Sequence, residues 1–188
     1  MGYSATHAQL LSVPPYIAAA IFCIIGSFLA DRLHTRAYIL LAFTPITISG
    51  FIILATVKTS SVRYFALFLA TTGAFTCSPI LLAWVSGNAA GPAVRAVVTG
   101  YAVGIANLGS IIATWTYLPA QAPYYAAGHW MNFGAACILF AVVACNMVYL
   151  QRENRLRMAG KRDYRVTGAT QAEIERLGHL HPEFRYTP

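Results

Sequence analysis

Few residues in the first 150 positions could take part in acid–base or nucleophilic chemistry. Asp31 is the only carboxylate there, and it lies in a short polar stretch with Arg32 and Arg36. The histidines of this region fall in or beside different loops, so no two of them share a helix at the spacing that a metal or a haem requires. The sequence therefore predicts no catalytic residue, no metal site and no bound cofactor, and an intramembrane enzyme is not expected.

The cysteines do not change this interpretation. None of the four belongs to a C-x-x-C pair, and all lie in apolar stretches: Cys23, Cys77, Cys137 and Cys145. Cysteine in such surroundings behaves as a small apolar side chain. We expect these four to pack inside helices.

The composition indicates a membrane protein. The 188 residues are 57% hydrophobic and only 10% charged, whereas a soluble domain carries about 25% charged residues. A chain with this few charges cannot cover its whole surface with groups that favour water. The lipid bilayer is therefore the expected partner. The net charge of +7 does not indicate nucleic acid, because the basic residues lie at the ends of apolar stretches and in a tail.

Five apolar stretches are long enough to cross a bilayer, for which about 17–25 residues are needed. They cover residues 14–30, 37–57, 64–87, 96–117 and 130–150. The sequence thus predicts an all-α integral membrane fold with five transmembrane helices in a bundle over residues 1–150. Residues 151–188 form a polar, basic tail that is too short for a core of its own. Thr170 and Glu173 have capping-box spacing, which predicts one short helix in a mostly flexible segment.

Lysine and arginine divide unequally between the two sides of this bundle. One side holds only Lys58 and Arg63, whereas the other holds Arg32, Arg36, Arg95 and the basic residues of the tail. Cytoplasmic loops carry an excess of these residues. We therefore expect the tail in the cytoplasm and the N-terminus outside.

Polar residues inside the predicted spans are the remaining candidates for a site. An unpaired amide in hydrocarbon costs several kcal/mol, so each such residue must face protein or water. Four residues are candidates for lining a solute path: Trp84, Asn88, Tyr101 and Asn107. Hydrogen bonding between helices is the alternative. It explains Asn88 and Asn107 equally well, and it is the favoured interpretation for Tyr101, Asn132 and Asn146. Gly100-x-x-x-Gly104 is a predicted helix-packing face.

Several motifs, in their order and spacing, resemble one family. They are Leu10-Leu11-Ser12-Val13-Pro14-Pro15-Tyr16, Asp31-Arg32 with Arg36, Ala83-Trp84-Val85-Ser86-Gly87-Asn88-Ala89-Ala90-Gly91 with Arg95, Asn107-Leu108-Gly109, Ala122-Pro123-Tyr124-Tyr125 with Gly128, and His181-Pro182-Glu183-Phe184-Arg185-Tyr186. The chain resembles the C-terminal half of a fungal major facilitator superfamily transporter. The nearest group is the anion:cation symporters of the allantoate and nicotinate permease type. The sequence departs from the family's usual pattern at three places. Pro92-Ala93-Val94 stands in place of a basic stretch, Gln121 in place of an acid, and Ser27, four residues before Asp31, in place of Gly.

The resemblance implies a twelve-helix fold of which this chain carries helices eight to twelve, so the missing N-terminal half is an expected partner. It also implies alternating access, with solute bound between the two halves. The expected substrate is a small organic anion, a vitamin- or ureide-like carboxylate, and the expected location is the plasma membrane. A proton is one expected coupling ion. Because no carboxylate lies in a predicted span, the acid that carries it is expected in the missing half.

The resemblance also gives the polar loops a role. Asp31, Arg32 and Arg36, with Arg95 after the third span, are the expected cytoplasmic gate-loop residues. The Asp31 charge is expected to stabilise the N-terminal end of a facing helix in the other half. The second hypothesis is a non-transporting membrane protein, either a truncated product or an accessory piece of another transporter chain.

Overall fold

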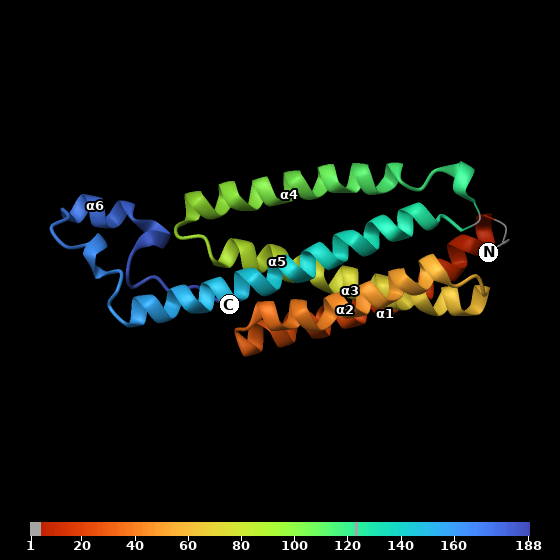
Figure 1. Cartoon of the computed structure of the whole chain (residues 1–188), viewed down its shortest axis with the longest axis horizontal. Helices are drawn as coiled ribbons and strands as arrows, with labels where there is room; N and C mark the ends of the chain where they lie inside the picture. The colour runs from red at the N-terminus through yellow and green to blue at the C-terminus, as the bar shows by residue number, and fades with distance from the viewer. Residues whose placement is uncertain (1–4, 123) are drawn as a thin grey trace.

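The computed structural model describes residues 5–122 and 124–188, so residues 1–4 and Pro123 of the exit-loop motif lie outside it. Five long helices dominate it: α1 (Ala5–Leu33), α2 (Arg36–Thr56), α3 (Ser60–Gly87), α4 (Pro92–Trp115) and α5 (Ala126–Met158). They extend along the long axis of the molecule (Figure 1). Each is long and apolar enough to cross a membrane, which confirms the predicted all-helical membrane fold.

The helices extend beyond the apolar stretches that predicted them. α1 begins at Ala5, ahead of Pro14 and Pro15, so both prolines lie inside the helix instead of at its start. α5 continues past Leu150 to Met158. Residues 151–158 include several good helix formers, and an ion pair at i,i+4 spacing in this extension further supports the helical conformation.

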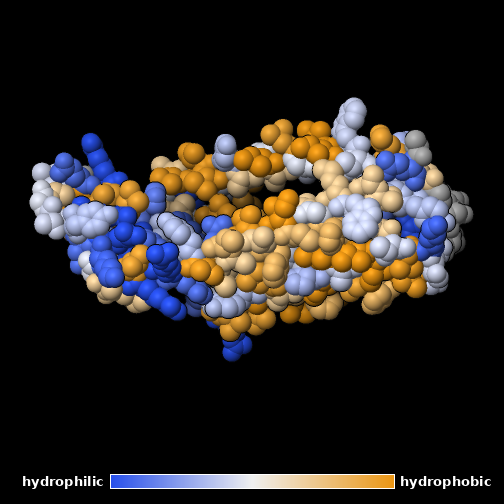
Figure 2. All heavy atoms as spheres, in the orientation of Figure 1, coloured by the Kyte–Doolittle hydropathy of each residue, from blue (hydrophilic) through white to orange (hydrophobic). Residues whose placement is uncertain are grey.

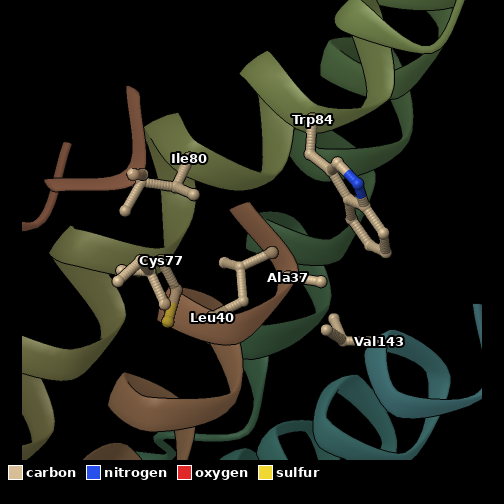
Figure 3. Close-up of a cluster of buried hydrophobic side chains, with 8 residues drawn as sticks. Ala37, Leu40, Cys77, Ile80, Trp84 and Val143 are labelled. Atoms are coloured by element: carbon tan, nitrogen blue, oxygen red, sulfur yellow. The ribbon is translucent and has the colours of Figure 1, made fainter. Parts of the chain in front are cut away.

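The core of the bundle lies around α2. This helix packs against both α3 and α5, while α1 packs against α3. Small residues allow α2 and α3 to approach closely, because a Cβ added at Gly50 would lie 2.5 Å from the backbone nitrogen of Ala70. Figure 3 shows the side chains that fill the core between α2, α3 and α5, among them Ala37, Leu40, Cys77, Ile80, Trp84 and Val143.

α4 stands apart from this core. None of its residues is buried, and it contacts mainly α3. Within the described part of the chain, nothing lies within 4 Å of a Cβ built on Gly100 or Gly104, so the predicted packing face has no neighbour here. Figure 2 shows hydrophobic atoms along the length of the helices and hydrophilic atoms gathered over the tail.

The tail folds back towards the bundle. It forms two 3-10 turns, η2 (Asp163–Arg165) and η3 (Gly178–Leu180), on either side of the short helix α6 (Gln171–Arg176). α6 begins directly after Thr170, whose backbone N–H donates to the Glu173 carboxylate at 2.8 Å. A third turn, η1 (Pro119–Gln121), lies in the α4–α5 connection at the opposite end of the molecule (Figure 1).

Candidate functional site

The gate-loop residues meet only in part. Arg36 forms an ion pair with Asp31 at 3.1 Å, and its Nη1 donates to the Ala83 carbonyl of α3 at 2.7 Å. Gly87 permits this approach, because a Cβ there would lie 2.6 Å from Nη1. Arg32 and Arg95 are exposed. Arg36 thus ties the α1–α2 loop to α3, a contact that the sequence does not indicate.

Trp84 and Asn88, two of the four path candidates, bind the tail. Trp84 is buried, and its indole Nε1 donates to the Thr187 carbonyl at 2.7 Å. The Asn88 amide donates to the same carbonyl at 3.0 Å and accepts from the Thr187 backbone N–H at 2.9 Å. The amide of Asn88 is therefore satisfied by backbone from outside the bundle.

The other two candidates lie on α4. Asn107 lines a cavity of about 510 Å³ between α3 and α4, together with Ser78, Pro79, Leu82 and Val85 of α3. Tyr101 is 72% exposed. The structure thus does not bring the four candidates into one site, and their role in a solute path stays a prediction.

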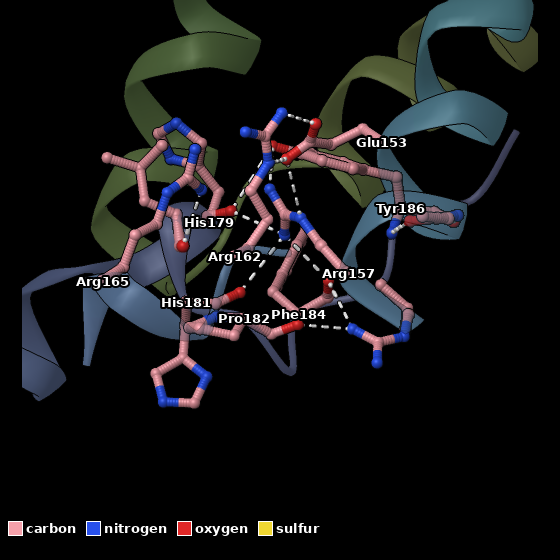
Figure 4. A network of polar contacts seen from close by, with 12 residues as sticks. Glu153, Arg157, Arg162, Arg165, His179, His181, Pro182, Phe184 and Tyr186 are labelled. Atoms are coloured by element: carbon pink, nitrogen blue, oxygen red, sulfur yellow. Dashed lines mark hydrogen bonds and ion pairs between the residues drawn. The ribbon is translucent and has the colours of Figure 1, made fainter. Parts of the chain in front are cut away.

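An arginine at the end of α5 organises the tail. Arg157 is only 3% exposed and forms an ion pair with Glu153 at 3.2 Å. Its Nη1 also donates to three tail carbonyls, those of His179 at 3.0 Å, His181 at 3.2 Å and Phe184 at 2.8 Å. Arg162 holds the second Glu153 oxygen at 2.7 Å. Figure 4 shows this network around the guanidinium of Arg157.

Residues 179–187, the tail strap, join two helices that have few contacts of their own. Asn154 of α5 donates to the Tyr186 carbonyl at 2.7 Å and accepts from its N–H at 2.9 Å. The next residue, Thr187, binds α3 as described above. The i,i+4 spacing of Glu153 and Arg157 is a sequence signal for their ion pair. No sequence signal indicates that Arg157 binds backbone carbonyls of the tail.

A second polar cluster lies at the end of the bundle opposite the tail. Arg63, in the first turn of α3, is only 5% exposed. Its Nη2 donates to the Tyr124 carbonyl at 3.0 Å, and its Cζ lies 5.3 Å from the centre of the Tyr124 ring. Lys58 lies 5.6 Å from the same ring centre. Arg63 Nε is buried without a hydrogen-bond partner among the described residues. The predicted spans 37–57 and 64–87 leave this arginine in the loop between them.

Neighbouring side chains in the α4–α5 connection are tied to one another. The Tyr117 hydroxyl lies 3.2 Å from His129 Nδ1 and accepts from the Asn132 amide at 3.0 Å. A Cβ at Gly128 would lie 2.7 Å from the Tyr117 ring, so only glycine fits there without a shift. His129, in the first turn of α5, is also buried.

Within residues 5–122 and 124–188, no group of three histidine, cysteine or acidic residues could hold a metal ion. The four cysteines are free thiols. The polar groups that the structure does bring together bind backbone, carbonyls or one another. These contacts hold neighbouring helices, and the tail, against one another.

Comparison with known proteins gives a consistent result. Over its whole length, the chain matches fungal MFS-type transporters. It is 31% identical to an uncharacterized transporter of Schizosaccharomyces pombe and 30% identical to the MFS-type transporter cnsO of Penicillium expansum. Each match covers 99% of the chain and 37% of the relative. It is 26% identical to the major facilitator-type transporter hxnP of Emericella nidulans, over 99% of the chain and 38% of that protein.

The chain therefore spans a little over a third of the length of these relatives. All three are named as transporters, which fits a chain that is not an enzyme. No family model matches the chain. No solved structure matches it either.

Proposed function

We propose that this chain is the C-terminal, five-helix portion of a secondary transporter that carries a small organic anion by alternating access. The cavity between α3 and α4 carries the proposal. It has a volume of about 510 Å³, it is lined mostly by apolar side chains, and Asn107 offers it an amide. Solute sites commonly combine an apolar lining with a few polar groups, and the relatives that match the chain are named as transporters.

The anion:cation symporter group is the family assignment that we propose, with a vitamin- or ureide-like carboxylate as solute and a proton as coupling ion. The chain has no carboxylate between Asp31 and Glu153, so the acid that carries the proton would belong to the rest of the transporter. The α4 helix, which has no buried residue, offers a free face to that part.

The tail end of the bundle is the proposed cytoplasmic side, and the Arg63 end is the proposed outer side of a plasma-membrane protein. Arg32, Arg36, Arg95 and the basic tail support this orientation through the positive-inside rule. The gate-loop role of Asp31 and Arg36 is part of the same proposal. Their ion pair and the bond to Ala83 would hold the α1–α2 loop against α3 while the two halves rock.

The test is uptake by a permease-deficient cell that expresses the complete reading frame containing this chain. Labelled carboxylate vitamins and ureides are supplied one at a time. We expect concentrative uptake of at least one, stopped by a protonophore. No uptake of any organic anion would contradict the proposed substrate class.

The Asn107→Leu variant tests the cavity. It keeps the volume of the side chain and removes its amide, so we expect a loss of uptake of about fivefold or more, the effect of one hydrogen bond. Asn146→Leu is the matched control, because the one hydrogen bond that Asn146 makes with the described residues is to the Val142 carbonyl of its own helix. Equal losses of uptake in the two variants would show that the cavity is not part of the solute path.

A further inference from the structure

Positive charge gathers at the Arg63 end of the bundle, and no acidic side chain accompanies it. Lys58 and Arg63 lie there, both against the Tyr124 ring. The six carboxylates of the chain are Asp31, in the loop at the tail end, and five residues beyond position 152. Figure 1 places the tail and the start of α3 at opposite ends of the molecule. Within the part of the chain that the structure describes, Arg63 therefore has no acidic partner.

The burial of Arg63 makes this lack of a partner costly. A buried charge destabilises a protein unless it is paired and hydrogen-bonded. Arg63 is 5% exposed, and its Nε has no hydrogen-bond partner among the described residues. The contacts with the Tyr124 carbonyl and ring supply hydrogen bonding and cation–π attraction. They supply no negative charge.

The helix ends add to the positive potential. α3 begins at Ser60 and α5 begins at Ala126, both at this end of the bundle. The N-terminus of a helix carries the positive end of its dipole, which favours an anion and disfavours a cation. A buried arginine in the first turn of α3 is therefore poorly placed until an anion joins it.

We propose that this end of the bundle binds a small carboxylate anion, which Arg63 contacts directly. The guanidinium matches the two oxygens of a carboxylate, and the unpartnered Nε is one of the donors that this ligand would use. Lys58, which is exposed, adds a charge at the entrance. The binding itself stands on Arg63, and only the identity of the anion as the transported solute rests on the proposed function.

Equilibrium dialysis of the 188-residue chain in phosphatidylcholine nanodiscs tests the site without any transport. The probes are labelled benzoate, its uncharged analogue benzamide, and inorganic phosphate, at low ionic strength. We expect benzoate to bind and benzamide not to bind. Benzoate binding should weaken as salt is added, because salt screens the exposed charge of Lys58. No benzoate binding, or binding of phosphate alone, would overturn the carboxylate site.

Single substitutions test whether Arg63 is the residue that binds benzoate. Arg63→Gln should weaken benzoate binding by about tenfold or more, and Arg63→Lys should retain part of it. Lys58→Gln changes an exposed side chain that does not support the fold, and it should weaken binding by a few-fold. Gln121→Glu places a carboxylate in the same connection as Tyr124, and it should compete with the ligand.

Arg155→Gln is the control, because this exposed arginine lies at the other end of α5. Thermal unfolding of each variant shows whether it is folded. Unchanged binding in folded Arg63→Gln, or equal weakening in Arg155→Gln, would refute the proposal. Benzoate binding in a protein that supports no uptake would contradict the transport function and leave the anion site in place.

Discussion

Among single side chains, Arg36 makes the contact that most changes the interpretation of its motif. The family resemblance implied only that this arginine belongs to the cytoplasmic gate loop. In the structure it contacts Asp31 and the Ala83 carbonyl of its own chain. The Asp31 side chain is 69% exposed, so the ion pair itself contributes at most about 1 kcal/mol. The bond to the Ala83 carbonyl, which is partly buried, is the stronger contact.

Arg36→Ala should therefore lower the free energy of unfolding by about 1–3 kcal/mol, the effect of removing a charged donor from a partly buried carbonyl. Thermal unfolding of the chain in nanodiscs measures this change. Arg32→Ala provides the comparison, because Arg32 is exposed one turn away and should have no measurable effect. If the two variants unfold alike, the Arg36–Ala83 contact does not hold the loop.

At the scale of helices, close packing depends on glycines that no motif marks. Gly50 faces the backbone of Ala70, whereas Gly104 faces open space within the described residues. Gly50→Ala should destabilise the bundle by about 1–3 kcal/mol, because α2 and α3 must separate to accept the methyl group. Gly104→Ala should be neutral or mildly stabilising. The measurement is the unfolding midpoint of each variant in the same nanodiscs. A lower midpoint for Gly104→Ala than for Gly50→Ala would contradict the packing of α2 on α3.

The tail strap depends on Arg157. Arg157→Met keeps the length of the side chain but removes its hydrogen bonds to three tail carbonyls and its ion pair with Glu153. Breaking a buried pair costs about 3–5 kcal/mol, and we expect the lower end because Arg162 still holds Glu153. Limited trypsin digestion should then cleave faster at Arg176 and Arg185. Arg155→Met is the control, and unchanged cleavage in the Arg157 variant would show that the strap is held by other contacts.

The short helix α6 should respond to acid. Hydrogen bonds from the backbone and then the hydroxyl of Thr170 hold the pKa of Glu173 below its usual 4.5. A carboxyl whose pKa is lower in the folded state stabilises that state above its usual pKa, and this stability is lost as the pH falls through the folded value. The Thr170 amide should therefore lose protection from exchange below about pH 4.5, as NMR can measure. Glu173→Gln should remove this dependence, and its persistence in that variant would assign it to another group.

For the molecule as a whole, hydropathy predicted the number and type of the membrane-spanning elements. Every backbone group in lipid must be paired within its own helix, so five long apolar stretches imply five helices. Contacts between distant segments follow from shape, which composition does not encode. Hence Trp84 and Asn88 could be recognised as polar groups that need partners, but their partner, the backbone of Thr187, could not. Arg63 was similarly assigned to a loop, because its burial depends on how Tyr124 folds over it.

The bond between Asn88 and Thr187 spans 99 positions of the chain, and this has a consequence for how the protein is made. The ribosome delivers Asn88 to the membrane long before Thr187 exists, so the amide enters without its final partner. Contacts between distant positions also form late, because closing a long loop costs entropy. The end of α3 that carries Asn88 is therefore among the last parts of this protein to mature. Until then the Asn88 amide has only its bond to the Trp84 carbonyl of its own helix, at 3.0 Å.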